Sequence, residues 1–194
     1  KGTDIWDLEN NKYFDASIMG IGTNILGYAN KEVDRAVRKN ISYSNMSTFY
    51  CPEEVYLAEK LVNMHPWADN VRFARTGGEA NAISIRIARA ATGRDKIAIC
   101  GYHGWHDWYL ATNLNSLENL EQHLLPGLEP NGVPKSLEGS TIPFRFNDLE
   151  EIKRIINNND LAAVKMEVQR SEKPNDGYLE AISAMCKEKG IVLI

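Results

Sequence analysis

The segment RTGGEAN at residues 75–81 lies between an apolar stretch, VRFA at 71–74, and a stretch with helical spacing, AISIRIARAA at 82–91. An apolar strand, a short turn and an amphipathic helix form the repeating unit of α/β proteins. The same alternation returns along the chain, which predicts an α/β fold with a mainly parallel sheet flanked by helices. The expected strands cover residues 71–74, 96–100, 161–168 and 191–194, and the expected helices cover 79–92, 148–158 and 178–189.

The first part of the chain has a different pattern. Residues 3–16, TDIWDLENNKYFDA, alternate apolar and polar residues around ENNK, which predicts a β-hairpin. Asn30 suits the N-cap of a helix over 31–40, and Pro52 suits the first turn of a helix over 52–65. Residues 101–147 lack the strand–helix alternation, and irregular passages of this length are usually functional or disordered.

Bulk composition excludes several classes of protein. The formal net charge is −4 and there is no basic run, so we expect no nucleic-acid partner. No run of about 18 apolar residues is present, so we expect no membrane span. The three cysteines, Cys51, Cys100 and Cys186, are far apart and odd in number, which indicates a reducing compartment and a cytoplasmic protein.

The glycine pair in RTGGEAN is the first candidate site. Ligands of parallel α/β sheets bind outside the carboxyl ends of the strands, and a helix N-terminus there offers free N–H groups to an anion. Gly77 and Gly78 let a phosphate approach the backbone, and Thr76 adds a hydroxyl donor. A tight strand-to-helix turn explains the glycines equally well. The segment matches neither the P-loop nor the G-x-G-x-x-G pattern.

The second candidate is CGYHGWHDW at 100–108, directly after an expected strand. Tyr102 offers a flat face to an aromatic cofactor, and His103 could donate or accept a proton. The spacing of His103 and His106 also fits two zinc ligands, but no further ligands at metal spacing follow, so we expect no metal. An aromatic cluster that only packs the loop is the alternative.

The third candidate is Glu167, at the end of the apolar strand 161–168. An acid in this place is rarely buried without a partner, so it is a candidate for the site lining. A solvent-exposed carboxylate and an ion pair with Lys165, two residues earlier on the same face, are the alternatives. One edge of the sheet would thus carry a phosphate-binding turn, an aromatic ring and an acid. This combination fits a flat phosphorylated cofactor better than a nucleotide.

These segments resemble the class III family of pyridoxal-phosphate-dependent aminotransferases, and within it the glutamate-1-semialdehyde 2,1-aminomutase-like branch. The match is collinear over essentially the whole chain. It rests on GTDIWDLENNKYFD at 2–15, ILGYANKEVDRAV at 25–37, VRFARTGGEANAISIRIARAATGRDKI at 71–97, GYHGWHD at 101–107, and the stretch from MEVQ at 166–169 to GIVLI at 190–194.

The resemblance implies a fold-type-I large domain that binds pyridoxal 5'-phosphate. Gly77 and Gly78 would bind the phosphate through their N–H groups beside Thr76, Tyr102 would stack on the pyridine ring, and Glu167 would lie near the ring. The implied cofactor-binding residues are Thr76, Gly77, Gly78, Tyr102, His103 and Glu167. Two departures are that Gly78 replaces the family's usual Ser or Thr, and Val168 replaces its proline.

The resemblance also implies contacts with substrate. Phe49 and Tyr50 belong to STFY at 47–50, which matches a family segment that approaches the substrate, often from the neighbouring subunit, so we expect a homodimer. Ile21 stands where relatives carry an aromatic residue that touches substrate. The partners implied are therefore a small-molecule amino donor and acceptor.

The domain assignment follows from the same resemblance. Residues 1–45 would be an N-terminal segment of the small domain, and residues 46–194 an incomplete large cofactor-binding domain. The Schiff-base lysine and the aspartate that binds the pyridine nitrogen are expected beyond Ile194, so we expect no catalytic residue here and no activity from these 194 residues alone.

The function expected of the whole protein is amino-group transfer on an amino acid, an amino aldehyde or a keto substrate. An intramolecular aminomutase is the alternative within the family. A non-catalytic cofactor-binding or regulatory fragment is the alternative from another class. A nucleotide-binding α/β protein is disfavoured because no dinucleotide or P-loop signature is present.

Overall fold

The computed structural model describes residues 1–43, 48–121, 123, 127–169 and 171–194. The chain divides into two compact units, Lys1–Val71 and Arg72–Ile194. The domain boundary predicted between residues 45 and 46 lies within 44–47, outside the described residues, and stays a prediction.

The first unit begins with the predicted hairpin. Strand β1 (Asp4–Trp6) pairs antiparallel with β2 (Lys12–Phe14). The turn between them is built on Asp7, whose Oδ1 accepts hydrogen bonds from the backbone N–H groups of Glu9 at 3.0 Å and Asn11 at 2.8 Å. An Asx side chain that bonds its own following backbone is a common turn device, and it fixes the register of the two strands.

Two helices complete the first unit, as the sequence predicts. Helix α1 (Lys31–Ile41) is capped by Asn30, whose Oδ1 accepts from the N–H groups of Glu32 and Val33. Helix α2 (Pro52–Met64) has its proline at the first helical position, where a missing N–H costs nothing. Neither helix buries a residue, so their apolar side chains remain available to other surfaces.

The second unit contains the predicted parallel sheet. Its strands are β3 (Lys96–Cys100), β4 (Thr141–Pro143), β5 (Leu161–Met166) and β6 (Val192–Leu193). All pairs are parallel and the order is β4-β3-β5-β6, so β3 and β5 lie inside the sheet. Strand β4 is new, since it falls within 101–147, where the sequence predicts no element.

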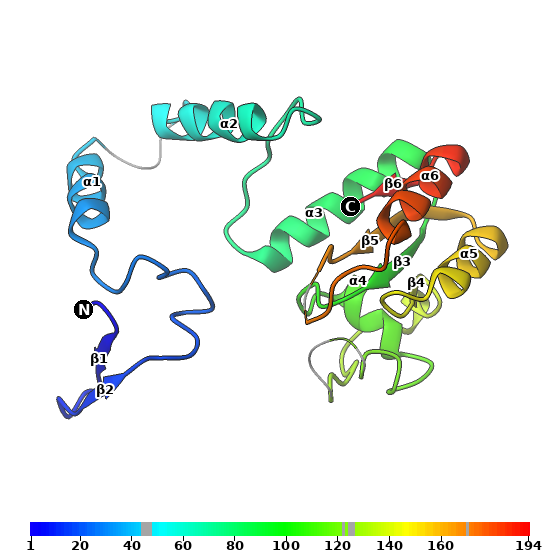
Figure 1. Cartoon of the computed structure of the whole chain (residues 1–194), viewed down its shortest axis with the longest axis horizontal. Coiled ribbons are helices and arrows are strands. Elements are labelled where there is room, and N and C mark those ends of the chain that lie inside the picture. The colour runs from blue at the N-terminus through cyan, green and yellow to red at the C-terminus, as the bar shows by residue number, and fades with distance from the viewer. Residues whose placement is uncertain (44–47, 122, 124–126, 170) are drawn as a thin grey trace. The chain divides into compact units, whose positions relative to one another are not determined.

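Helices cover both faces of this sheet, as Figure 1 shows for α3 and α5 on opposite sides of β3 and β5. The helices are α3 (Gly77–Thr92), α4 (Asp107–Leu110), α5 (Leu149–Asn158) and α6 (Tyr178–Lys189), with short 3-10 helices η1 (Ala111–Asn113) and η2 (Lys135–Leu137). One apolar cluster joins α3 and α4 to Ile97 and Ile99 of β3. A second cluster joins α5 and α6 to Ala98 and Val164.

The prediction of a strand at residues 71–74 is wrong. These residues have no regular secondary structure and pair with no described strand, and the boundary between the two units falls within them. An apolar run becomes a strand only when another strand accepts and donates its backbone hydrogen bonds. The pattern of side chains alone cannot supply that partner.

Arg94 ties the amino-terminal edge of the sheet together. Its Nη1 donates to the carbonyl oxygens of Leu161 at 3.1 Å, Lys189 at 3.1 Å and Gly190 at 3.2 Å. Its Nε lies 2.8 Å from Oδ1 of Asp160. The guanidinium group therefore joins the start of β5 to the end of α6, and through α6 it fixes the entry into β6.

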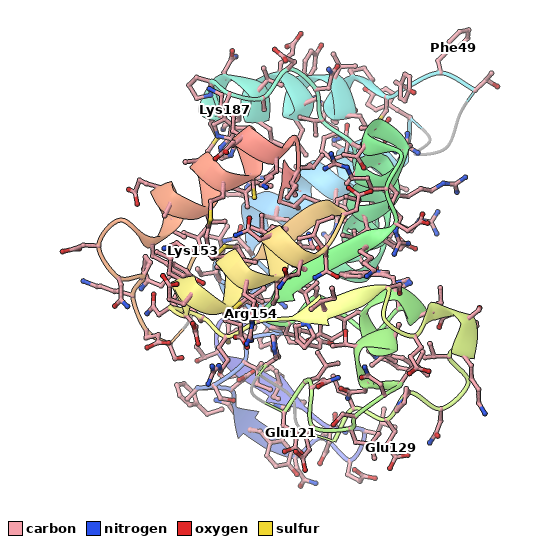
Figure 2. All side chains as sticks on the ribbon, turned by 90° about the vertical axis from the view of Figure 1, so that its right-hand side faces the viewer. Phe49, Glu121, Glu129, Lys153, Arg154 and Lys187 are labelled. Carbon is pink, nitrogen blue, oxygen red and sulfur yellow. The ribbon has the colours of Figure 1, made fainter. Side chains whose placement is uncertain are left out.

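Replacing Arg94 with alanine should lower the free energy of unfolding of the whole protein by about 2 kcal/mol, because hydrogen bonds from a charged donor to three carbonyls are lost. Arg94→Lys should recover only part of this, since an ammonium group lacks the planar fork. Lys187→Ala, at an exposed position on α6 (Figure 2), is the matched control. Equal denaturation midpoints for Arg94→Ala and Lys187→Ala would contradict the stabilising role of the Arg94 contacts with β5 and α6.

Candidate functional site

The start of α3 is fixed by a reciprocal cap. Thr76 is the N-cap, and its Oγ1 accepts a hydrogen bond from the N–H of Glu79 at 3.1 Å. The carboxylate of Glu79 reaches back and accepts from the N–H of Arg75 at 2.9 Å. This arrangement is a variant of the capping box, which sets where the helix begins. The helix begins at Gly77, two residues before the predicted start, so both glycines belong to its first turn.

The N–H groups of Gly77 and Gly78 have no acceptor among the described residues. The first amides of a helix have no carbonyl within the helix to bind, and the aligned peptide dipoles give this end a partial positive charge. The hydroxyl of Thr76 uses a lone pair for Glu79 and keeps its hydrogen to donate. The start of α3 thus presents two amides and one hydroxyl to an anion.

The loop after β3 packs tightly against this helix start. Nδ2 of Asn81 donates to the carbonyl oxygen of His103 at 3.0 Å, which holds the loop to α3. A Cβ on Gly104 would lie 3.1 Å from Cα of Gly78, and a Cβ on Gly78 would lie 2.8 Å from Nε2 of His106. Both contacts are closer than ordinary packing allows, so neither position accepts a side chain without movement.

Loop and helix start together line a hollow of about 470 Å³. Its lining consists of Thr76, Gly78, Tyr102, Gly104, Trp105 and His106. The ring of Tyr102 meets that of Tyr109 edge to face, with centroids 5.9 Å apart and an interplanar angle of 84°. Since Tyr109 is buried, it gives Tyr102 a rigid support. The structure therefore brings three predicted site residues together in one cavity.

Glu167, which directly follows β5, holds the loop after β3 in place. Its Oε1 accepts a hydrogen bond from the N–H of Tyr102 at 3.2 Å, and its own N–H donates to the carbonyl oxygen of Cys100 at 3.2 Å. The side chain lines a separate hollow of about 220 Å³ that also contains Gly101 and His123. Glu167 therefore orients the residue that carries the aromatic ring without lining the larger cavity.

His103 is part of the packing beneath the loop. It is buried, its ring stacks on Trp108, and Nε2 lies 2.9 Å from the carbonyl oxygen of Cys100. Because a carbonyl only accepts, Nε2 carries the hydrogen and the neutral ring donates it. Burial, with the positive charge of Lys165 second, lowers the pKa of His103 to about 4. The residue is thus neutral near pH 7, and it does not line the larger cavity.

Lys165 is buried in the sheet, whereas the sequence left open an ion pair with Glu167 as one alternative. Its Nζ lies 3.4 Å from Oγ of Ser84 on α3, and no described ion pair includes it. Burial lowers the pKa of Lys165 to about 8 from its usual 10.5. A buried ammonium group with one weak polar contact destabilises the folded state.

The substrate candidates all belong to the other unit. Ile21, Phe49 and Tyr50 lie in Lys1–Val71, with 88%, 84% and 81% of their surface exposed. Ile21 has a φ of 56°, which is unusual for a β-branched residue and places it in a tight turn. Their assignment to a substrate stays a prediction.

Sequence reasoning considered His106 only as a zinc ligand and did not consider Asn81 at all. The described residues contain no group of three or more His, Cys, Asp and Glu side chains that could hold a metal. The contacts of His106 and Asn81 are between α3 and the loop after β3, and no local pattern encodes them. Among the described residues, no helix combines the length and the hydropathy that a membrane span requires.

Two solved structures resemble this chain along its whole length. A crystal structure of an omega-transaminase from Sphaerobacter thermophilus has a TM-score of 0.85 and 27% identity, over 100% of this chain and 46% of that one. A transaminase with PLP bound has a TM-score of 0.83 and 26% identity, with the same coverage of both chains. The sheet and its flanking helices therefore form part of the fold of PLP-dependent transaminases.

The family model for class-III aminotransferases matches residues 1–194 of this chain. The 3-aminobutyryl-CoA aminotransferase of Cloacimonas acidaminovorans is 31% identical over 100% of this chain and 45% of its own length. The glutamate-1-semialdehyde 2,1-aminomutase of Methanosphaera stadtmanae is 32% identical over 100% and 46%. The chain belongs to the class-III aminotransferase family, which confirms the resemblance read from the sequence. It spans about half the length of the curated relatives it matches.

Replacing Lys165 with methionine should raise the melting temperature of the whole protein by roughly 5 °C at pH 7. The folded-state pKa of about 8 lies below the usual 10.5, so the unfolded chain binds more protons between these values and stability rises with pH there. The gain should therefore be largest below pH 8 and vanish near pH 10.5.

Lys153→Met, on the solvent side of α5 (Figure 2), is the control and should show no gain that depends on pH in this way. A gain for Lys165→Met that is the same at pH 7 and pH 10 would mean that packing, not charge burial, causes it.

Proposed function

We propose that the whole protein binds pyridoxal 5'-phosphate and uses it to transfer an amino group on an amino acid, an amino aldehyde or a keto substrate. The observation that carries the proposal is the shared cavity of Thr76, Gly78 and Tyr102 at the start of α3. Family membership supplies the class of chemistry. The relatives named above include an aminotransferase and an aminomutase, and both move an amino group by their names.

The donor set fits the phosphate of this cofactor. The amides of Gly77 and Gly78 and the hydroxyl of Thr76 all lie at the positive end of a 16-residue helix. Phosphate oxygens accept several hydrogen bonds and carry negative charge, so both features favour binding. Gly78 and Gly104 lack a Cβ, and this absence allows the close contact between the helix start and the loop that line the cavity.

Tyr102 fits the ring of the cofactor. Tyr102 lines the same cavity as Gly78, its backbone is held by Glu167, and its ring rests on Tyr109. A flat aromatic ligand gains from stacking on a side chain that is already immobile, because less conformational entropy is lost on binding. The neutral, buried His103 acts as an anchor of the loop in this proposal rather than as a proton donor.

Pyridoxal phosphate, when bound, supplies an electron sink for changes at the carbon that carries the amino group. The residues described above bind the phosphate, orient the ring and hold the loop. The small-molecule amino donor and acceptor, and the contacts of Ile21, Phe49 and Tyr50 with them, are part of the same proposal.

Absorbance spectroscopy of the whole protein tests the proposal. Addition of pyridoxal phosphate should produce a protein-bound absorbance band that survives gel filtration and changes when an amino donor is added. A bound cofactor whose spectrum never responds to amino donors would favour a non-catalytic cofactor-binding or regulatory protein. Absence of any bound cofactor would overturn the proposal.

We also propose that the whole protein is a cytoplasmic homodimer. The cysteines Cys51, Cys100 and Cys186 are free, which suits a reducing compartment. Helices α1 and α2 bury no residue, which leaves apolar surface for a second subunit. Light scattering should give twice the monomer mass, and a concentration-independent monomer would contradict the dimer.

Tyr102→Ala should raise the dissociation constant of pyridoxal phosphate about 2- to 12-fold in the whole protein, which corresponds to a stacking contribution of about 0.5–1.5 kcal/mol. Tyr102→Phe is the matched control and should keep the affinity, because it keeps the ring. Equilibrium dialysis measures both. Unchanged affinity in Tyr102→Ala would remove the residue from the cofactor site.

A further inference from the structure

His106 occupies the place that a side chain at position 78 would take. An ideal Cβ on Gly78 would lie 2.8 Å from Nε2 and 2.9 Å from Cδ2 of His106. The imidazole edge therefore lies directly against the first turn of α3, over the residue whose N–H has no acceptor among the described residues. A residue larger than glycine at position 78 would push the ring away.

The backbone of His106 is held in place by α4. The carbonyl oxygen of His106 accepts from the N–H groups of Tyr109 at 2.9 Å and Leu110 at 3.1 Å, which makes His106 the N-cap of α4. Trp108, Tyr109 and Leu110 are all buried in the core. These side chains anchor α4 and Asn81 anchors the preceding loop, so the backbone of His106 is fixed beside the start of α3, while its side chain is exposed.

The imidazole itself is unused by the protein. Neither ring nitrogen of His106 has a hydrogen-bond partner among the described residues, and the side chain lines the same hollow as Thr76, Gly78 and Tyr102. A neutral imidazole carries one N–H donor and a protonated one carries two. The lining of the hollow thus contains a further donor beside the amide of Gly78 and the hydroxyl of Thr76.

We propose that His106 binds the phosphate of the cofactor by donating a ring N–H to a phosphate oxygen. The proposal rests on the proposed function, and it adds a binding residue that the sequence pattern did not reveal. It also gives Gly78 a second reason to lack a side chain: the position must admit the imidazole as well as the phosphate. Positions 78 and 106 are therefore coupled.

The first test uses the whole protein with His106→Phe, which keeps a ring of similar size and removes both nitrogens. The dissociation constants of pyridoxal phosphate and of pyridoxal, which lacks the phosphate, are measured in parallel. We expect about a tenfold loss of affinity for pyridoxal phosphate, the size of one hydrogen bond to a charged group, and no loss for pyridoxal. His65→Phe, an exposed histidine of the other unit, is the control.

The second test is a double-mutant cycle between positions 78 and 106. Gly78→Ser alone should weaken the binding of pyridoxal phosphate, because its Cβ displaces the imidazole. In the His106→Ala background the same Gly78→Ser change should strengthen binding, because the new hydroxyl finds the space empty. A cycle in which the two changes add independently would contradict the coupling.

The outcomes separate the two proposals. A wild-type protein that does not bind pyridoxal phosphate contradicts the proposed function itself. A wild type that binds it, with His106→Phe unchanged in affinity and in melting temperature, overturns the role of His106 and leaves the proposed function standing. An equal loss for pyridoxal phosphate and pyridoxal also overturns it, because the ring would then shape the cavity without binding the phosphate.

Discussion

Backbone contact between the start of α3 and the loop after β3 is the constraint on which the candidate site depends. Gly104 lies so close to Gly78 that a Cβ would fall 3.1 Å from its neighbour's Cα, and Asn81 fixes that approach with a hydrogen bond to the loop. This contact places Gly78 at the helix start and the aromatic Tyr102 in one cavity. The start of α3 and the loop after β3 are thereby joined into one binding surface.

The polar groups at this edge of the sheet divide into those that support and those that face the cavity. Glu167, directly after β5, accepts from the N–H of Tyr102 in the loop, and the neutral His103 donates from the loop to the carbonyl oxygen of Cys100 at the end of β3. Thr76, Tyr102 and His106 line the hollow itself. A supported loop loses little freedom when a ligand arrives, which favours binding.

Sequence reasoning succeeded where structure is encoded locally and failed where it depends on a tertiary partner. The hairpin of β1 and β2, the cap at Asn30 and the parallel sheet were predictable, because turn, cap and periodicity signals lie within a few residues. The strand predicted at 71–74 lacks a partner, and β4 is too short, at 3 residues, to show a period. The contact of His106 with Gly78 spans two elements, so no local pattern could reveal it.

Arg94 fixes the amino-terminal edge of the sheet, whereas the candidate site lies at the opposite, carboxyl-terminal edge. The contacts of Arg94 that stabilise the domain and the residues of the candidate site thus lie at opposite ends of the same strands. Loops at the carboxyl edge are free to diverge in length and composition while the hydrogen bonds of Arg94 keep the sheet intact. Such a division lets one architecture acquire new substrates during evolution without first losing its ability to fold.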